Sequence, residues 1–395
     1  MKQRGRQPGP LVAHVIERLL WGSSPFFLID VGCSRGIDNR WHLFGEHLRA
    51  IGFDPLVAEI DRLNNLNPYP GVTYVAALVV CREYDSLFPP ELRRDRIRSK
   101  NNDVFPRVST TAVFERSDVS YMQERYNKGA PLVMTDRMVE LDEVIEAQDQ
   151  SRVDFLKIDT DGHDIEVLLG AKAILAAAGL LGVKVEVPLH GAIHPCANTF
   201  ANIDGLLRQQ GFSLFDLTTF RHSRRHLPAP FLYNLPASTT SGQVVWGDAV
   251  YFRDLAALDY EHMWTYEVTP ERVLKLACLF DLFDLPDCAA ELLLNRGEFL
   301  RPDEREHLLD LLVTGEPGSY AEHMSLFEND YKALYPSRLN SRTPGVDHET
   351  PTKQVQHLRS RLVTLRKKNA SLQERLRARD ERIDKLKRQA DRHRD

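Results

Sequence analysis

The sequence predicts an α/β protein built on a doubly wound sheet of seven strands. Three observations lead to this fold class: short apolar segments recur along the chain, helical segments separate them, and the first runs directly into a glycine-bearing loop. The predicted strands are 26–30, 48–53, 72–80, 153–158, 181–187, 213–216 and 246–252. In such sheets the ligand crevice lies at the carboxyl edge of the strands.

The first strand carries the clearest sign of a binding loop. Its four apolar residues are followed by Asp30, and then by Gly32 and Gly36. Glycine lets the backbone turn sharply and approach a ligand, and we expect exposed N–H groups in this loop to suit a polar ligand. The second strand ends in Asp54, where an acid can accept hydrogen bonds from ribose hydroxyls. These features predict a nucleotide-type pocket, with a glycine turn in an unrelated α/β domain as the alternative.

The predicted cofactor site combines this loop with nearby strand ends. Its residues are Asp30, Gly32, Cys33, Ser34, Gly36, Asp54, Ala76 and Asp159. Ala76, a small residue near the end of the third strand, leaves room for an adenine ring. Cys33 is interpreted as a small spacer rather than a nucleophile.

Candidate catalytic residues follow the fourth and fifth strands. The first group, after the fourth strand, is Asp159, Asp161 and His163. The second group, at the end of the fifth strand, is Glu186 and His190, together with His194. A histidine or carboxylate can take a proton from a substrate hydroxyl group. Acids at the start of a helix also interact favourably with its dipole, which is the structural alternative for Asp161 and Asp164. A weaker hypothesis is that Asp159, Asp161 and Glu186 together hold Mg²⁺.

Several of these motifs resemble known methyltransferases. The spacing Asp30-x-Gly-x-x-x-Gly36 resembles motif I of class I S-adenosylmethionine-dependent methyltransferases. Together with Phe53-Asp54-Pro55, the block 156–171 and the closing strand, it resembles the FkbM-type methyltransferases over residues 25–254. The chain has Asp161 where that family commonly has Glu. The resemblance implies S-adenosylmethionine as methyl donor and, most often, a hydroxyl acceptor on a sugar, polyketide or similar intermediate.

Composition predicts a soluble, cytoplasmic protein. The five cysteines are widely spaced and form no CxxC pair, which argues against a disulfide scaffold or zinc site. No apolar run is long enough to span a membrane. The expected organisation is a basic tail and lead-in helix at 1–24, the methyltransferase domain at 25–254, a helical segment at 255–335, a linker at 336–351 and a coiled coil at 352–395. Within the domain, residues 82–135 are interpreted as an insertion that covers the acceptor site.

The C-terminal tail differs in charge from the rest of the chain. Residues 353–395 contain fifteen Lys/Arg and six Asp/Glu, a local charge of +9, while the whole chain carries −5. Apolar residues recur there with heptad spacing, mostly Leu at d, and Asn369 falls at an a position, which favours a parallel two-stranded coiled coil and hence a homodimer. The basic surface suits anionic lipid or an acidic protein partner. Nucleic acid is disfavoured, because no base-reading module accompanies the tail.

The resemblance to the FkbM-type methyltransferases thus implies an S-adenosylmethionine-dependent methyltransferase that acts on a hydroxyl. The alternative from another class is a non-catalytic nucleotide-fold scaffold dimerised by its coiled coil, which the intact acid and glycine set disfavours. A nicotinamide oxidoreductase lacks support because the third glycine of its fingerprint is missing. The basic run 222–226 either faces an anionic acceptor or forms a solvated loop.

Overall fold

The computed structural model describes residues 9–88, 134–147, 152–191, 193–232, 238–259, 268–313 and 318–334. Contacts divide the chain into two units, 1–324 and 325–395. The described sheets and helices belong to the first unit, except that the last helix, α13 (Tyr320–Leu334), extends into the second. The predicted coiled coil at 352–395 and most of the predicted insertion at 82–135 lie outside the described ranges.

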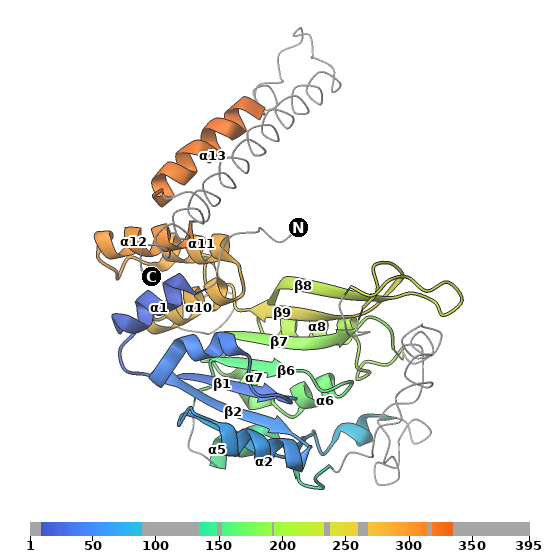
Figure 1. Cartoon of the computed structure of the whole chain (residues 1–395). Helices are drawn as coiled ribbons and strands as arrows, with labels where there is room; N and C mark the ends of the chain where they lie inside the picture. The colour runs from blue at the N-terminus through green and yellow to red at the C-terminus, as the bar shows by residue number, and fades with distance from the viewer. Residues whose placement is uncertain are drawn as a thin grey trace, which may run out of the picture. The chain divides into compact units, whose positions relative to one another are not determined.

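A seven-stranded sheet forms the centre of the first unit (Figure 1). Its strands are β1 (Phe26–Val31), β2 (Leu48–Asp54), β3 (Val72–Ala76), β6 (Phe155–Ile158), β7 (Gly182–Pro188), β8 (Ser213–His222) and β9 (Gln243–Phe252). The order is β3-β2-β1-β6-β7-β9-β8, parallel as far as β7, with β9 antiparallel to both of its neighbours. This is the arrangement of the class I methyltransferase sheet, so the predicted fold class is confirmed.

Helices cover both faces of the sheet. They are α1 (Pro10–Glu17), α2 (Val57–Leu66), α5 (Leu141–Ala147), α6 (Asp164–Leu169), α7 (Lys172–Ala176), α8 (Phe200–Gln209), α10 (Pro270–Leu282), α11 (Pro286–Arg296) and α12 (Pro302–Leu312). Side chains alternate across β1, so that Phe26 and Leu28 pack with α1, α2 and α10 to α12, while Phe27 and Ile29 pack with α5 to α8. All six residues of β1 are buried, as expected for a central parallel strand.

Two predicted elements differ from the structure near the first strands. The segment after Gly36, predicted as helical, forms the 3-10 helix η1 (Asn39–His47), which is interrupted at Gly45. Its buried residues Trp41 and Phe44 are three positions apart, and both rings stack on Phe26, which suits the three-residue turn of a 3-10 helix.

The third strand is shorter than predicted. It ends at Ala76, and β4 (Leu78–Val79) pairs instead with β5 (Met138–Val139) in a separate parallel sheet. The apolar run 72–80 gave no sign of this break, because each of the two short pieces is apolar by itself. A 3-10 turn, η2 (Tyr84–Leu87), follows β4.

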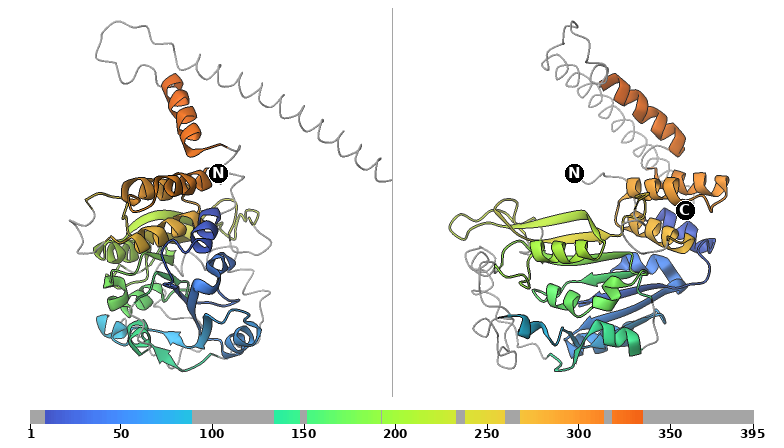
Figure 2. Two further views of the ribbon diagram at one scale, coloured as in Figure 1. Left: turned by 90° about the vertical axis from the view of Figure 1, so that its left-hand side faces the viewer. Right: turned by 180° about the vertical axis from the view of Figure 1, so that it is seen from behind.

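The predicted helical segment is present as α10, α11 and α12. Each of these helices begins with a proline at its first position, where the missing N–H costs nothing. Helix α1, far away in sequence, lies beside α10 (Figures 1 and 2), and backbone N–H groups of Leu11 and Val12 donate to the buried carboxylate of Asp281. Helices α1 and α10 therefore form one layer on the sheet, and α11 and α12 pack against these two helices (Figure 1).

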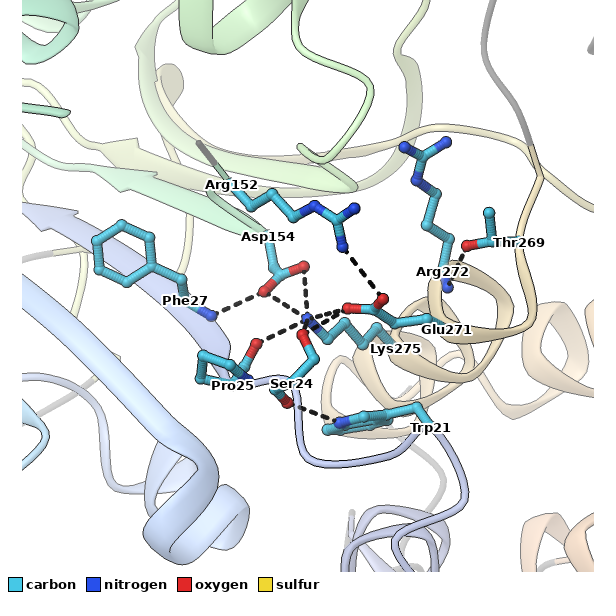
Figure 3. Close-up of polar contacts among 10 residues, drawn as sticks. All are labelled: Trp21, Ser24, Pro25, Phe27, Arg152, Asp154, Thr269, Glu271, Arg272 and Lys275. Carbon is cyan, nitrogen blue, oxygen red and sulfur yellow. Dashed lines mark hydrogen bonds and ion pairs between the residues drawn. The ribbon is translucent and has the colours of Figure 1, made fainter. Parts of the chain in front are cut away.

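A buried ion pair joins this layer to the amino edge of the sheet (Figure 3). Nζ of Lys275 lies 2.7 Å from the carbonyl oxygen of Pro25, 3.0 Å from Oδ2 of Asp154 and 3.0 Å from Oε1 of Glu271. Asp154 also accepts the backbone N–H of Phe27 at 2.8 Å. Burial raises the pKa of Asp154, an effect that the nearby Lys275 opposes.

Candidate functional site

The glycine loop after β1 is fixed against the tip of β6. Gly32 has φ +80°, and a Cβ at this position would lie 1.7 Å from the carbonyl oxygen of Asp159. A larger residue would therefore push β1 and β6 apart at the carboxyl edge. The position requires glycine for close backbone packing as well as for its φ value.

The backbone N–H groups of this loop are used within the protein. The N–H groups of Gly32 and Cys33 donate to the carbonyl oxygen of Phe53 at 2.8 and 3.1 Å, and that of Gly36 donates to Cys33. The N–H of Arg35 donates to Oε1 of Glu59 at 2.9 Å. The expectation that the loop offers exposed N–H groups is therefore wrong for these four residues, because closing the loop uses them.

The tips of β1 and β2 instead present carboxylates. Oδ1 of Asp54 accepts the N–H of Leu56 at 2.9 Å. Burial raises the pKa of Asp54, and hydrogen bonds from the backbone of Leu56 and Ser34 oppose that rise. Asp30 lies one strand away and is buried, and its burial raises its pKa to about 6 in spite of the nearby Lys157.

Lys157 connects the loop, Asp30 and Asp159. Its Nζ donates to the carbonyl oxygen of Gly32 at 2.8 Å, and it lies 3.0 Å from Oδ1 of Asp30 and 3.7 Å from Oδ2 of Asp159. Burial of Lys157 alone would lower its pKa, but Asp30 and Asp159 reverse this, so its pKa is raised and it stays charged. Lys157 was not among the predicted site residues, although its place in the Lys-Ile-Asp block was a signal that could have found it.

The acidic turn after β6 is divided into exposed and buried parts. Asp161 adopts φ +53° and Gly162 φ +117°, which bends the chain sharply before α6. Asp161 is exposed as a residue, but partial desolvation of its carboxyl group, followed by the charges of Asp159 and Asp54, raises its pKa. Asp164 is buried and accepts hydrogen bonds from Thr160 and Asn198. Asp164 lies in the first turn of α6, as the structural alternative states, whereas Asp161 lies near Asp159 and Asp54.

Glu186 on β7 lies near the same acids. Burial, followed by the charges of Asp164, Asp159, Asp161 and Asp248, raises its pKa to about 9. Its carboxyl group is therefore protonated at pH 7, so its O–H can donate a hydrogen bond while its carbonyl oxygen can still accept one. The site thus combines a neutral carboxyl group with ionisable acids at neighbouring strand tips.

The three candidate histidines have different surroundings. Nε2 of His190 lies 2.7 Å from the carbonyl oxygen of Val244 and donates to it, which leaves Nδ1 as the ring's proton acceptor. Nδ1 of His163 lies 3.2 Å from Oε2 of the buried Glu166. His194 stacks on Phe88 and accepts the N–H of Cys196. His190 and His163 therefore each keep one ring nitrogen that can accept a proton, whereas Nδ1 of His194 already accepts the N–H of Cys196.

The remaining predicted cofactor positions lie around the loop. Cys33 is buried, and its burial raises the pKa of its thiol, consistent with a spacer. Ser34 is exposed beside Asp54. Gly36 has φ +90° and packs near Tyr74, while Ala76 lies opposite Asp54 on the adjacent strand. Among the residues that the structure describes, no group of three or more His, Cys, Asp or Glu is arranged to hold a metal ion, so the hypothesis of a Mg²⁺ set is not supported.

Within the described ranges, no helix is long and apolar enough to cross a membrane.

A comparison with protein families agrees with the strand order, since both indicate a methyltransferase fold. Residues 105–214, less than half of the chain, match the methyltransferase FkbM domain. No curated protein matches the chain. The matched segment includes β6, the acidic turn and β7.

Three solved structures illustrate the remote similarity to known folds. A TehB-like S-adenosylmethionine-dependent methyltransferase from Corynebacterium glutamicum is 11% identical, with a TM-score of 0.24, over 62% of this chain and 87% of its own. A Burkholderia thailandensis 1,6-didemethyltoxoflavin N1-methyltransferase, solved with S-adenosylhomocysteine, is 12% identical, with a TM-score of 0.25, over 62% and 79%. The N-methyltransferase NodS from Bradyrhizobium japonicum is 8% identical, with a TM-score of 0.24, over 61% and 93%.

At these TM-scores the three similarities carry no argument about the reaction, and the fold assignment rests on the chain's own strand order. The chain has a class I methyltransferase fold, and part of it is similar to the FkbM methyltransferase domain.

Proposed function

We propose that the protein is an S-adenosylmethionine-dependent methyltransferase acting on a hydroxyl of a sugar, polyketide or related intermediate. The observation that carries the donor assignment is the chemistry of the carboxyl edge. Asp30, Asp54, Asp159 and Asp161 gather there, while the loop's N–H groups at Gly32, Cys33, Arg35 and Gly36 are already used. Such an edge favours a cationic ligand rich in hydrogen-bond donors and disfavours a diphosphate.

S-adenosylmethionine fits this set of carboxylates. It carries a sulfonium, an ammonium and two ribose hydroxyls, and Asp54 occupies the position that binds ribose hydroxyls in nucleotide folds. Asp30 and Asp159 supply negative charge beside it, and Lys157 fixes their positions. When bound, the cofactor supplies an electrophilic methyl group, and the protein's task is mainly to position the acceptor.

The hydroxyl assignment rests on groups that can handle a proton. His190 keeps Nδ1 as an acceptor because Nε2 donates to Val244, and such a nitrogen can take the hydroxyl proton. The neutral carboxyl of Glu186 can donate a hydrogen bond to another acceptor oxygen and so orient the substrate. The preference for a sugar or polyketide comes from the resemblance to FkbM-type methyltransferases.

Replacing Asp54 with alanine tests the donor assignment. We expect affinity for S-adenosylmethionine to fall roughly ten- to a hundredfold, because hydrogen bonds to a charged group contribute about 1.5–3 kcal/mol. Isothermal titration calorimetry of Asp54→Ala is compared with that of Asp61→Ala, which removes an exposed acid from α2. Equal affinities in both variants would contradict the assignment, and no saturable binding to the parent protein would favour the non-catalytic scaffold.

The pH dependence of methyl transfer tests the role of Glu186. Its carboxyl group is neutral below a pKa of about 9 and charged above it, so we expect the rate to fall as the pH rises through this value. Glu186→Gln keeps a neutral donor and should lose this alkaline limb, whereas Glu146→Gln, on the exposed side of α5, should keep it. An alkaline limb that persists in Glu186→Gln would show that another group titrates.

A further inference from the structure

The hairpin that connects β8 to β9 leaves the sheet at the edge of the candidate site. β7 and β8 run in the same direction, because both are antiparallel to β9. The chain after β8 therefore emerges at the carboxyl edge, and Figure 1 shows the hairpin continuing past the end of β7. Its described residues are 223–232 and 238–242.

The hairpin exposes several apolar side chains close together in sequence. Leu227 is 85% exposed, Leu232 54% and Phe231 39%. A single exposed leucine is ordinary, but three large apolar side chains within six residues indicate a surface that contacts something less polar than water.

The described backbone beside these side chains is hydrogen-bonded within the hairpin. The backbone N–H of Leu232 donates to the carbonyl oxygen of Ser238 at 2.9 Å. The backbone N–H of Thr240 donates to the carbonyl oxygen of Pro230 at 2.8 Å. Ala229 N–H donates to Oγ of Ser223 at 2.8 Å. These three hydrogen bonds tie the described parts of the hairpin together, while Leu227, Phe231 and Leu232 remain exposed.

The same segment is cationic, in a chain whose net charge is negative. No Asp or Glu occurs from Leu217 to Gly247, while Arg221, Arg224 and Arg225 all lie there. Arg225 and His226 are exposed immediately before Leu227. The guanidinium of Arg224 donates to Gln243, whose side chain also contacts His190, so the cationic base of the hairpin adjoins the site.

We propose that this hairpin docks the protein on an anionic lipid surface. Leu227, Phe231 and Leu232 enter the headgroup region, and the arginines face lipid phosphates. Apolar side chains next to cationic ones form the combination that binds the membrane interface, because buried apolar area and attraction to anionic lipids both contribute to binding. A soluble acidic partner would satisfy the charges but would leave three apolar side chains without an apolar environment.

Docking in this way would place the carboxyl edge next to the lipid headgroups. If the proposed methyl transfer is correct, the acceptor would then be presented at the membrane surface, and this extension rests on the proposed function. Docking itself does not depend on the proposed function, so the experiment measures vesicle binding in the absence of cofactor and acceptor.

Vesicle binding by the full chain tests the proposal. We expect the protein to co-sediment with phosphatidylglycerol-rich vesicles, to bind phosphatidylcholine vesicles at least tenfold more weakly, and to dissociate at high salt. The variant Leu227→Ser/Leu232→Ser should partition at least tenfold more weakly than the parent. The matched control is Leu66→Ser/Leu258→Ser, because these leucines are 68% and 67% exposed near the opposite edge of the sheet, and it should bind as the parent does.

The basic C-terminal tail can also attract anionic vesicles, so binding must be located in the chain. Hydrogen–deuterium exchange with vesicles should slow in peptides covering 223–242, and circular dichroism and thermal unfolding should show that both double variants are folded. Protection confined to residues 352–395, equal binding by the hairpin variant and the parent, or no binding to anionic vesicles would each overturn the proposal.

Discussion

Replacing Lys275 with methionine is expected to lower the free energy of unfolding by about 3–5 kcal/mol, as for other buried ion pairs that lose one partner. The substitution leaves Asp154 buried at the amino edge of the sheet without its cation. The carboxyl group can escape part of this cost by taking up a proton, since burial already raises its pKa. Urea denaturation followed by circular dichroism measures the change.

A compensating substitution separates the charge effect from a packing effect. The double variant Asp154→Leu/Lys275→Met removes both charges, and such replacements are often neutral or stabilising, so much of the lost stability should return. Arg152→Ala is a matched control, because Arg152 is exposed and pairs with Glu271 at 3.2 Å in the same network, and it should cost no more than about 1 kcal/mol. A single variant as stable as the parent would show that the pair contributes nothing.

Replacing Lys157 with methionine is expected to weaken S-adenosylmethionine binding at least tenfold and to change its pH dependence. In the parent protein Asp30 has a pKa of about 6, so affinity should rise as the pH increases through this value and the carboxylate forms. Lys157 is the main charge that opposes the effect of burial on Asp30, so without it the pKa of Asp30 should rise further. The midpoint of the affinity profile should therefore move to higher pH, as measured by calorimetry across a pH series.

Two further variants show whether the Lys157 effect comes from its charge and position. Lys157→Arg keeps the cation and should restore most of the affinity. Lys184→Met removes a neighbouring cation on β7 that pairs mainly with Asp248, so it should shift the midpoint much less. An unchanged midpoint in Lys157→Met would mean that Lys157 only stabilises the fold.

The parts of the site that follow local patterns were predictable. Asp30, Asp54 and Asp159 each end an apolar strand, and parallel strands bring such ends to one edge, so the sequence alone placed them together. The raised pKa of Glu186 was not predictable, because it depends on burial and on acids from other elements. The hydrogen bonds that Gly32 and Cys33 donate to Phe53 were likewise not predictable, because they depend on how the glycine loop closes on that residue.

Other features depend on contacts between distant segments. Lys275 and Asp154 are 121 positions apart, and a lysine within an amphipathic helix is ordinarily expected to be exposed. The pairing of α1 with α10 through Asp281 similarly joins residues that are 270 positions apart. The break between β3 and β4 was missed because an apolar run does not show where a strand changes partners.

Strand β6 has a buried ion pair at each end, Asp154 with Lys275 just before it and Lys157 with Asp30 within it. Sliding this short strand by two residues would keep each side chain on the same face of the sheet but would separate both pairs of charges. Deleting or inserting two residues within 154–158 should therefore be far more damaging than the hydrophobic pattern suggests. The same two contacts hold the carboxyl end of the strand, where we propose that the methyl donor binds, at a fixed distance from the helical layer that covers its other end.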